Sequence, residues 1–131
     1  MKKLNVFILG GTKDSTEIIK HLKSNYNTKI LTTTTTEYGS KLAIEAGSDE
    51  TIARPLLKDE IIKIINNSDF DLLIDATHPF AEHITQTSVS VSQICDIAYI
   101  RFERPPLSFE NIDDSHIVYA KSFEDAGKII S

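Results

Sequence analysis

The clearest structural signal in the sequence is the run Leu4-Asn5-Val6-Phe7-Ile8-Leu9-Gly10-Gly11-Thr12. Its first six residues are almost all apolar, with β-branched and aromatic members, which is typical of a strand buried in a parallel sheet. Two glycines end this strand. A helical pattern follows over residues 14–24, where Ile18, Ile19 and Leu22 have helical spacing. A buried strand that turns through glycine into a helix predicts the first unit of a βαβ protein.

The same alternation continues along the chain. Further strands are predicted over residues 28–33, 51–53, 71–75, 97–102 and 117–119, and further helices over residues 40–46, 58–66 and 80–95. Residues 34–39 are expected to form a loop, and Leu42, Ala43 and Ala46 to share the buried side of the helix after it. The fold class is therefore α/β, a Rossmann-like doubly wound parallel sheet of about five strands with helices on both faces.

Two domains are expected. Residues 1–115 are predicted to form a nucleotide-binding domain, and residues 116–131 the beginning of a second α/β domain. A strand and a helix start with so little after them bury their apolar faces poorly, so the chain is interpreted as a fragment of a longer protein.

Composition excludes several classes of function. The net charge of the 131 residues is −5, and no run of Lys or Arg is present, so nucleic-acid binding is not expected. No apolar run reaches the ~20 residues of a membrane span, and no signal peptide is seen, so we expect a cytoplasmic protein. The four histidines lack metal-ligand spacing, and Cys95, on an apolar helical stripe, is expected to be a buried thiol.

In doubly wound sheets, ligands bind beyond the carboxyl ends of the strands. Gly10, Gly11 and Thr12 follow the first strand. Glycines let the backbone approach a pyrophosphate closely, and the next helix offers free N–H groups. We therefore predict cofactor binding here. The motif departs from G-x-G-x-x-G, and a simple tight turn is the alternative.

Hydroxyl groups occupy the end of the second strand, in the run Thr32 to Thr36. NAD sites usually place an acid here, and none occurs before Glu37. Hydroxyls can donate to a 2′-phosphate without repelling it, so Thr33 and Thr34 are candidate ligands of NADPH. The alternative is the β-propensity of threonine alone.

A third cluster follows the fourth strand in the run from Asp75 to Phe80. Thr77, His78 and Pro79 are candidate cofactor-binding residues, and His78 is also a candidate proton donor, because imidazole titrates near neutral pH. For Asp75 the favoured interpretation is that it satisfies loop amides.

Arg101 and Arg104 come at the end of the fifth strand. Two arginines in this place can bind substrate carboxylates bidentately. Surface pairing with Glu103 or other nearby acids is the alternative.

Four segments in matching order resemble the precorrin-6A reductase family of cobalamin biosynthesis, including its cobalt-precorrin-6A type. They are Ile8-Leu9-Gly10-Gly11-Thr12, Thr36-Glu37-Tyr38-Gly39, Ile74-Asp75-Ala76-Thr77-His78-Pro79-Phe80-Ala81 and Tyr99-Ile100-Arg101-Phe102-Glu103-Arg104-Pro105. The Asp-Ala-Thr-His-Pro-Phe-Ala run is the most specific. The resemblance covers essentially the whole chain.

This resemblance implies NADPH-dependent reduction of a double bond in a tetrapyrrole, converting (cobalt-)precorrin-6A to (cobalt-)precorrin-6B. It implies that Gly10, Gly11 and Thr12 hold the pyrophosphate, that Thr77, His78 and Pro79 lie near the nicotinamide, and that a second domain closes over the site. Tyr38 joins Arg101 and Arg104 as a candidate substrate ligand. The sequence fixes neither the oligomeric state nor whether the substrate carries cobalt.

Three other functions are alternatives to a precorrin-6A reductase. A short-chain dehydrogenase needs a Tyr-x-x-x-Lys pair, and no tyrosine here has a lysine four residues later. A flavodoxin-like electron carrier could hold an FMN phosphate with the hydroxyls of residues 12–16. A non-catalytic nucleotide-binding module would bind NADPH without oxidising it in the presence of substrate.

Overall fold

The computed structural model describes residues 3–77, 82–102 and 117–120, and within these ranges the strands form one parallel sheet of six strands in the order β3-β2-β1-β4-β5-β6. The strands are β1 (Leu4–Leu9), β2 (Thr28–Thr34), β3 (Glu50–Ala53), β4 (Leu72–Asp75), β5 (Ala98–Phe102) and β6 (Ile117–Ala120). The helices are α1 (Lys13–Asn25), α2 (Glu37–Ala46), α3 (Lys58–Asn67) and α4 (Glu82–Cys95).

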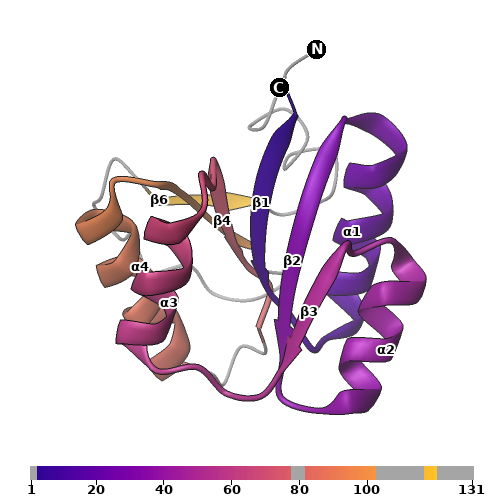
Figure 1. Cartoon of the computed structure of the whole chain (residues 1–131), viewed down its shortest axis with the longest axis horizontal. Coiled ribbons are helices and arrows are strands. Elements are labelled where there is room, and N and C mark those ends of the chain that lie inside the picture. The colour runs from indigo at the N-terminus through magenta and orange to yellow at the C-terminus, as the bar shows by residue number, and fades with distance from the viewer. Residues whose placement is uncertain (1–2, 78–81, 103–116, 121–131) are drawn as a thin grey trace.

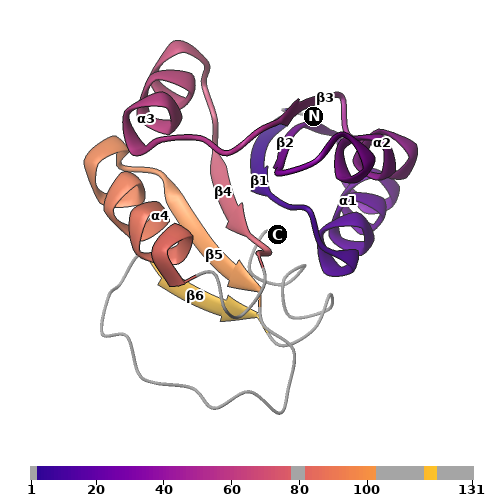
Figure 2. The same cartoon turned by 90° about the horizontal axis from the view of Figure 1, so that it is seen from below.

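The helices cover both faces of the sheet. Helices α1 and α2 lie on one side, and α3 and α4 lie on the other, as Figures 1 and 2 show from two directions. Every strand pair is parallel. The doubly wound Rossmann-like class is therefore confirmed. The strand order reverses between β1 and β4, which makes the carboxyl ends of these two strands the switch point, where ligands bind in this class of sheet.

Each face of the sheet has its own apolar core. On the α1 and α2 side, Val6 and Ile8 pack with Ile19 and Leu22. On the α3 and α4 side, the core residues are Phe7, Leu9, Leu31, Ile61, Ile65, Leu73, Val91, Ile97 and Tyr99. Alternate residues of β1 thus face opposite cores, which explains why this strand is an almost continuous apolar run.

Helix α2 begins earlier than predicted. Residues 37–39 were expected in a loop, but the hydroxyl of Thr36 accepts a hydrogen bond of 3.0 Å from the amide of Gly39, and the helix starts at Glu37. A threonine cap satisfies an amide that the helix leaves unpaired, so a start here is stable. The expected place of Leu42 in the core was also wrong, because Leu42 is exposed, while Ser40, Ala43 and Ala46 are buried.

The strand expected near residue 117 is present, but it does not begin a separate layer. β6 pairs in parallel with β5, with Tyr99 opposite Ile117 and Phe102 opposite Ala120. It therefore satisfies the backbone groups of β5 as the sixth strand of the same sheet. The expected domain boundary after residue 115 and the second domain itself stay predictions.

Candidate functional site

The two glycines after β1 adopt a turn that other residues would disturb. The amide of Gly10 donates to the carbonyl of Thr33 over 2.8 Å. A Cβ atom at Gly10 would lie 2.8 Å from Cγ2 of Thr32, which is closer than real contacts allow. Gly11 has a φ of +92°, a conformation that L side chains rarely adopt. The turn therefore brings bare backbone to the carboxyl end of β1.

Thr12 uses its hydroxyl within the protein. The oxygen accepts from the amide of Ser15 over 3.1 Å, and the hydroxyl proton is donated to the carbonyl of Ala76 over 2.7 Å. Among the described residues, the amides of Gly11 and Lys13 have no acceptor. The predicted cofactor contact at Gly10 to Thr12 is thus available from the backbone at the positive end of α1, not from the threonine hydroxyl.

The threonines at the end of β2 are less open than predicted. Thr33 and Thr34 are buried, and the Thr34 hydroxyl donates to the carbonyl of Thr36 over 2.8 Å. Thr35 and Thr36 are exposed at the start of the next crossover. A ligand at this edge would meet these two residues first. The roles of Thr33 and Thr34 in cofactor binding stay predictions.

A cleft of about 380 Å³ lies between α1 and α2, and it borders both crossovers. Its lining includes Gly11, Lys13, Thr36 and Tyr38. Tyr38 is 71% exposed, so its ring is free to contact a ligand. The volume is at the lower end of what ligand pockets have, which suits one half of a dinucleotide. The cleft therefore joins two of the four places predicted from the sequence.

Five polar residues meet behind the end of β4, and we call them the Asp75 cluster. The carboxylate of Asp75 is fully buried and accepts from the hydroxyls of Thr77, Thr85 and Tyr99 over 2.6, 2.8 and 2.7 Å. It also accepts from the Thr77 amide over 3.1 Å and from the guanidinium of Arg101 over 2.9 Å. The interpretation that Asp75 satisfies loop groups is correct but incomplete, since Tyr99 and Arg101 of β5 contribute as well.

The sequence prediction for Arg101 is not supported by its position. Its side chain is 3% exposed and pairs with Asp75, so the guanidinium faces the protein interior. The alternative was an ion pair on the surface with Glu103 or another nearby acid. Arg101 does form an ion pair, but its partner is the buried Asp75. Contact between Arg101 and a substrate therefore stays a prediction.

Several predicted site residues lie outside the described residues. These are His78, Pro79 and Arg104. Thr77, which immediately precedes His78, is described, and its hydroxyl and both backbone polar groups are hydrogen-bonded to Asp75 or Arg101. Thr77 is therefore held in place at the carboxyl end of β4.

The described part of the chain also bears on the thiol, on metal binding and on membrane spans. Burial raises the pKa of the Cys95 thiol, which disfavours the reactive thiolate. No group of three or more His, Cys, Asp or Glu residues that could hold a metal occurs among the described residues. Within the same residues, no helix combines the length and apolar character that a membrane span requires.

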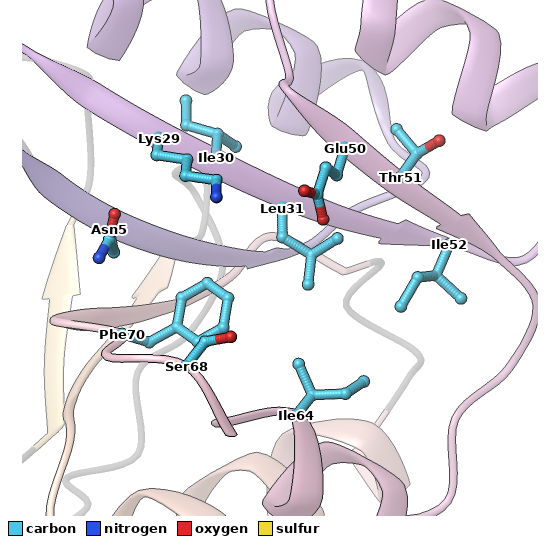
Figure 3. Close-up of a pocket in the computed structure, with 10 residues that line it drawn as sticks. All are labelled: Asn5, Lys29, Ile30, Leu31, Glu50, Thr51, Ile52, Ile64, Ser68 and Phe70. Atoms are coloured by element: carbon cyan, nitrogen blue, oxygen red, sulfur yellow. The ribbon is translucent and has the colours of Figure 1, made fainter. Parts of the chain in front are cut away.

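A second cleft of about 300 Å³ opens between α3 and strands β2 and β3. The apolar side chains of Leu31, Ile52, Ile64 and Phe70 gather around it, with Lys29 and Glu50 at the strands (Figure 3). None of the residues predicted to bind cofactor or substrate lines this cleft. The first cleft is therefore the candidate nucleotide site.

A doubly wound parallel sheet with helices on both faces, and with a glycine turn at its switch point, defines a Rossmann-like protein. The profile of the precorrin-6x reductase family, CbiJ/CobK, matches residues 5–130. The chain belongs to this family. Curated relatives agree with this assignment, and a solved structure shares the fold.

The cobalt-precorrin-6A reductase of Methanocaldococcus jannaschii is 40% identical over 126 residues, which are 96% of this chain and 49% of that protein. The cobalt-precorrin-6A reductase of Methanococcus maripaludis is 38% identical over 96% of this chain and 49% of its own length. The solved structure of the CobK precorrin-6A reductase matches with a TM-score of 0.64 at 20% identity, over 82% of this chain and 40% of that chain. This chain spans about half the length of these curated relatives.

The glycine turn gives a first prediction. Replacing Gly11→Ala should cost about 1–2 kcal/mol of stability because φ is positive there, and should weaken binding of a nicotinamide dinucleotide about tenfold by turning the free amides away. Gly47→Ala is the matched control, since Gly47 has a φ of +121° at the opposite end of α2. Thermal unfolding and calorimetric titration measure both effects, and equal losses of affinity in the two variants would contradict the site.

Proposed function

We propose that this chain forms the NADPH-binding part of a cytoplasmic precorrin-6A reductase, which reduces a double bond of (cobalt-)precorrin-6A to give (cobalt-)precorrin-6B. Family membership over residues 5–130 and 40% identity to a curated cobalt-precorrin-6A reductase support this proposal. The observation that carries it is the turn from Gly10 to Lys13, where free amides meet the positive end of a helix at the switch point.

The diphosphate would be held by the backbone. The amides of Gly11 and Lys13 are the available donors, and the absence of a side chain at Gly11 leaves room beside Thr34, whose Cα would be 3.9 Å from a Cβ at Gly11. Because these donors are fixed by the helix and by the Thr12 cap, they need no rearrangement when an anion binds. The nucleotide thus fits the groups that are present.

The charges around the first cleft support the proposed preference for NADPH over NADH. No acidic side chain ends β2, and the charged side chains that line the cleft are two cations, Lys13 and Lys20, and one acid, Glu45. The exposed Thr35 can add a hydroxyl at the same edge. A 2′-phosphate would therefore meet a cation and hydroxyls, where an NAD site usually has a carboxylate.

The reaction itself would take place over β4 and β5. When bound, NADPH supplies the hydride, and a proton must come from the protein or from water. Thr77, His78 and Pro79 follow β4 in the sequence, and we propose that this segment lies near the nicotinamide and that His78 is the proton donor. The substrate carries acetate and propionate carboxylates, for which Arg104 is the proposed partner, and the exposed ring of Tyr38 is a proposed surface for the macrocycle.

Cofactor choice can be tested on this chain directly. In calorimetric titrations, NADPH should bind more tightly than NADH, and Lys13→Met should weaken NADPH binding about tenfold while leaving NADH binding nearly unchanged. Lys29→Met is the control, because it removes the same charge from the second residue of β2, at the other end of the sheet. Tighter binding of NADH, or of FMN, would overturn the proposed cofactor.

The proton donor needs a form of the enzyme that turns over. There, His78→Ala should lower kcat about 100-fold, the usual contribution of a general acid, while the affinity for NADPH changes little. His21→Ala in α1 serves as a control that lies away from the switch point. A kcat for His78→Ala equal to that of the unmodified enzyme would remove His78 from this role.

A further inference from the structure

The Asp75 cluster connects three elements and has no exposed carboxylate or guanidinium. Asp75 of β4 stands opposite Arg101 of β5 in the sheet register, and Thr85 reaches the same carboxylate from the first turn of α4. Asp75 and Tyr99 are 0% and 1% exposed. Burial of an ion pair is weak evidence for a gain in stability, because desolvation offsets the attraction. The role of the Asp75 cluster is therefore better inferred from the geometry of its hydrogen bonds.

All polar groups of Thr77 are held by two residues of this cluster. Its amide and hydroxyl donate to the same oxygen of Asp75, and its carbonyl and hydroxyl oxygens accept from one nitrogen of Arg101 over 3.0 and 3.1 Å. The hydroxyl can do both, because it donates one proton and accepts through a lone pair. Thr77 is thus fixed in position and in rotamer.

Ala76, which precedes Thr77, is hydrogen-bonded to the end of β1 and to the first crossover. The amide of Ala76 donates to the carbonyl of Leu9 over 3.0 Å, and the carbonyl of Ala76 accepts from the hydroxyl of Thr12 over 2.7 Å. The turn proposed to hold the diphosphate and the turn that carries Thr77 are therefore joined by two hydrogen bonds across the switch point. Every backbone polar group of Ala76 and Thr77 has a partner.

We propose that Asp75 and Arg101 are positioning residues, which hold the Thr77 turn in the place where it receives the nicotinamide half of the dinucleotide. This inference rests on the proposed function. Because both side chains are buried, they act on the nicotinamide half of the cofactor through Thr77. A rigid turn at a fixed distance from the diphosphate places the nicotinamide with little ordering of the protein on binding.

The test compares NADPH with a fragment that lacks nicotinamide, 2′-phospho-ADP-ribose. The Arg101→Lys variant keeps the positive charge opposite Asp75, but the shorter lysine chain cannot place its ammonium where the terminal guanidinium nitrogen contacts Asp75 and Thr77 together. We expect its affinity for NADPH to fall about tenfold, and its affinity for the fragment to stay within about twofold of wild type. Tyr99→Phe, which removes one donor to Asp75 and keeps the buried ring, should give the same pattern with a smaller loss.

Val91→Ala is the control for loss of stability alone, because Val91 is fully buried in the same core as Tyr99 and takes no part in the cluster. It should lower the melting temperature and leave both affinities unchanged. Equal losses of affinity for NADPH and for the fragment in Arg101→Lys would overturn the inference. Equal affinities of the wild-type chain for the two compounds would also overturn it, because the nicotinamide would then contribute nothing to binding. That second result would leave the proposed nucleotide binding intact. A wild-type chain that binds neither compound would overturn the proposed function, and this inference with it.

Discussion

The hydrogen bond from the Thr12 hydroxyl to the Ala76 carbonyl holds together the two crossovers that border the switch point. It can form because β1 and β4 are parallel neighbours, with Leu9 opposite Asp75, so both chains leave the sheet at the same edge. This bond uses the only proton of the hydroxyl, and its oxygen also accepts the Ser15 amide that it caps, so no proton is left for a ligand. Recognition of an anion at this corner is therefore a task for backbone amides.

The buried pair of Asp75 and Arg101 places a second constraint on this corner. Removal of one partner from a buried ion pair typically costs about 3–5 kcal/mol, a large part of the roughly 5–15 kcal/mol that stabilises a whole domain. Such a pair tolerates few substitutions. Apolar residues at these two positions could stabilise the fold equally well. The buried ion pair at the end of β4 is therefore better explained by the turn that it holds in place.

The sequence predicted well what depends on local pattern. The apolar run of Leu4 to Leu9, the glycine turn and the alternation of strands and helices follow from periodicity and from the backbone needs of glycine, and each lies as expected. Features that depend on contacts between distant residues were predicted less well. The partner of Arg101 follows from the register of β4 against β5, and the place of β6 follows from the open edge of β5. The Thr36 cap was a local signal that could have placed the start of α2 correctly.

A crystal structure of this chain with NADPH would show whether the backbone holds the diphosphate. We expect the diphosphate oxygens to accept hydrogen bonds from the amides of Gly11 and Lys13, with the Thr12 hydroxyl still bonded to Ala76. A diphosphate bound elsewhere, for example in the apolar cleft beside Phe70, would contradict it. So would a complex in which side chains fill the corner above Gly11 and leave no room for an anion.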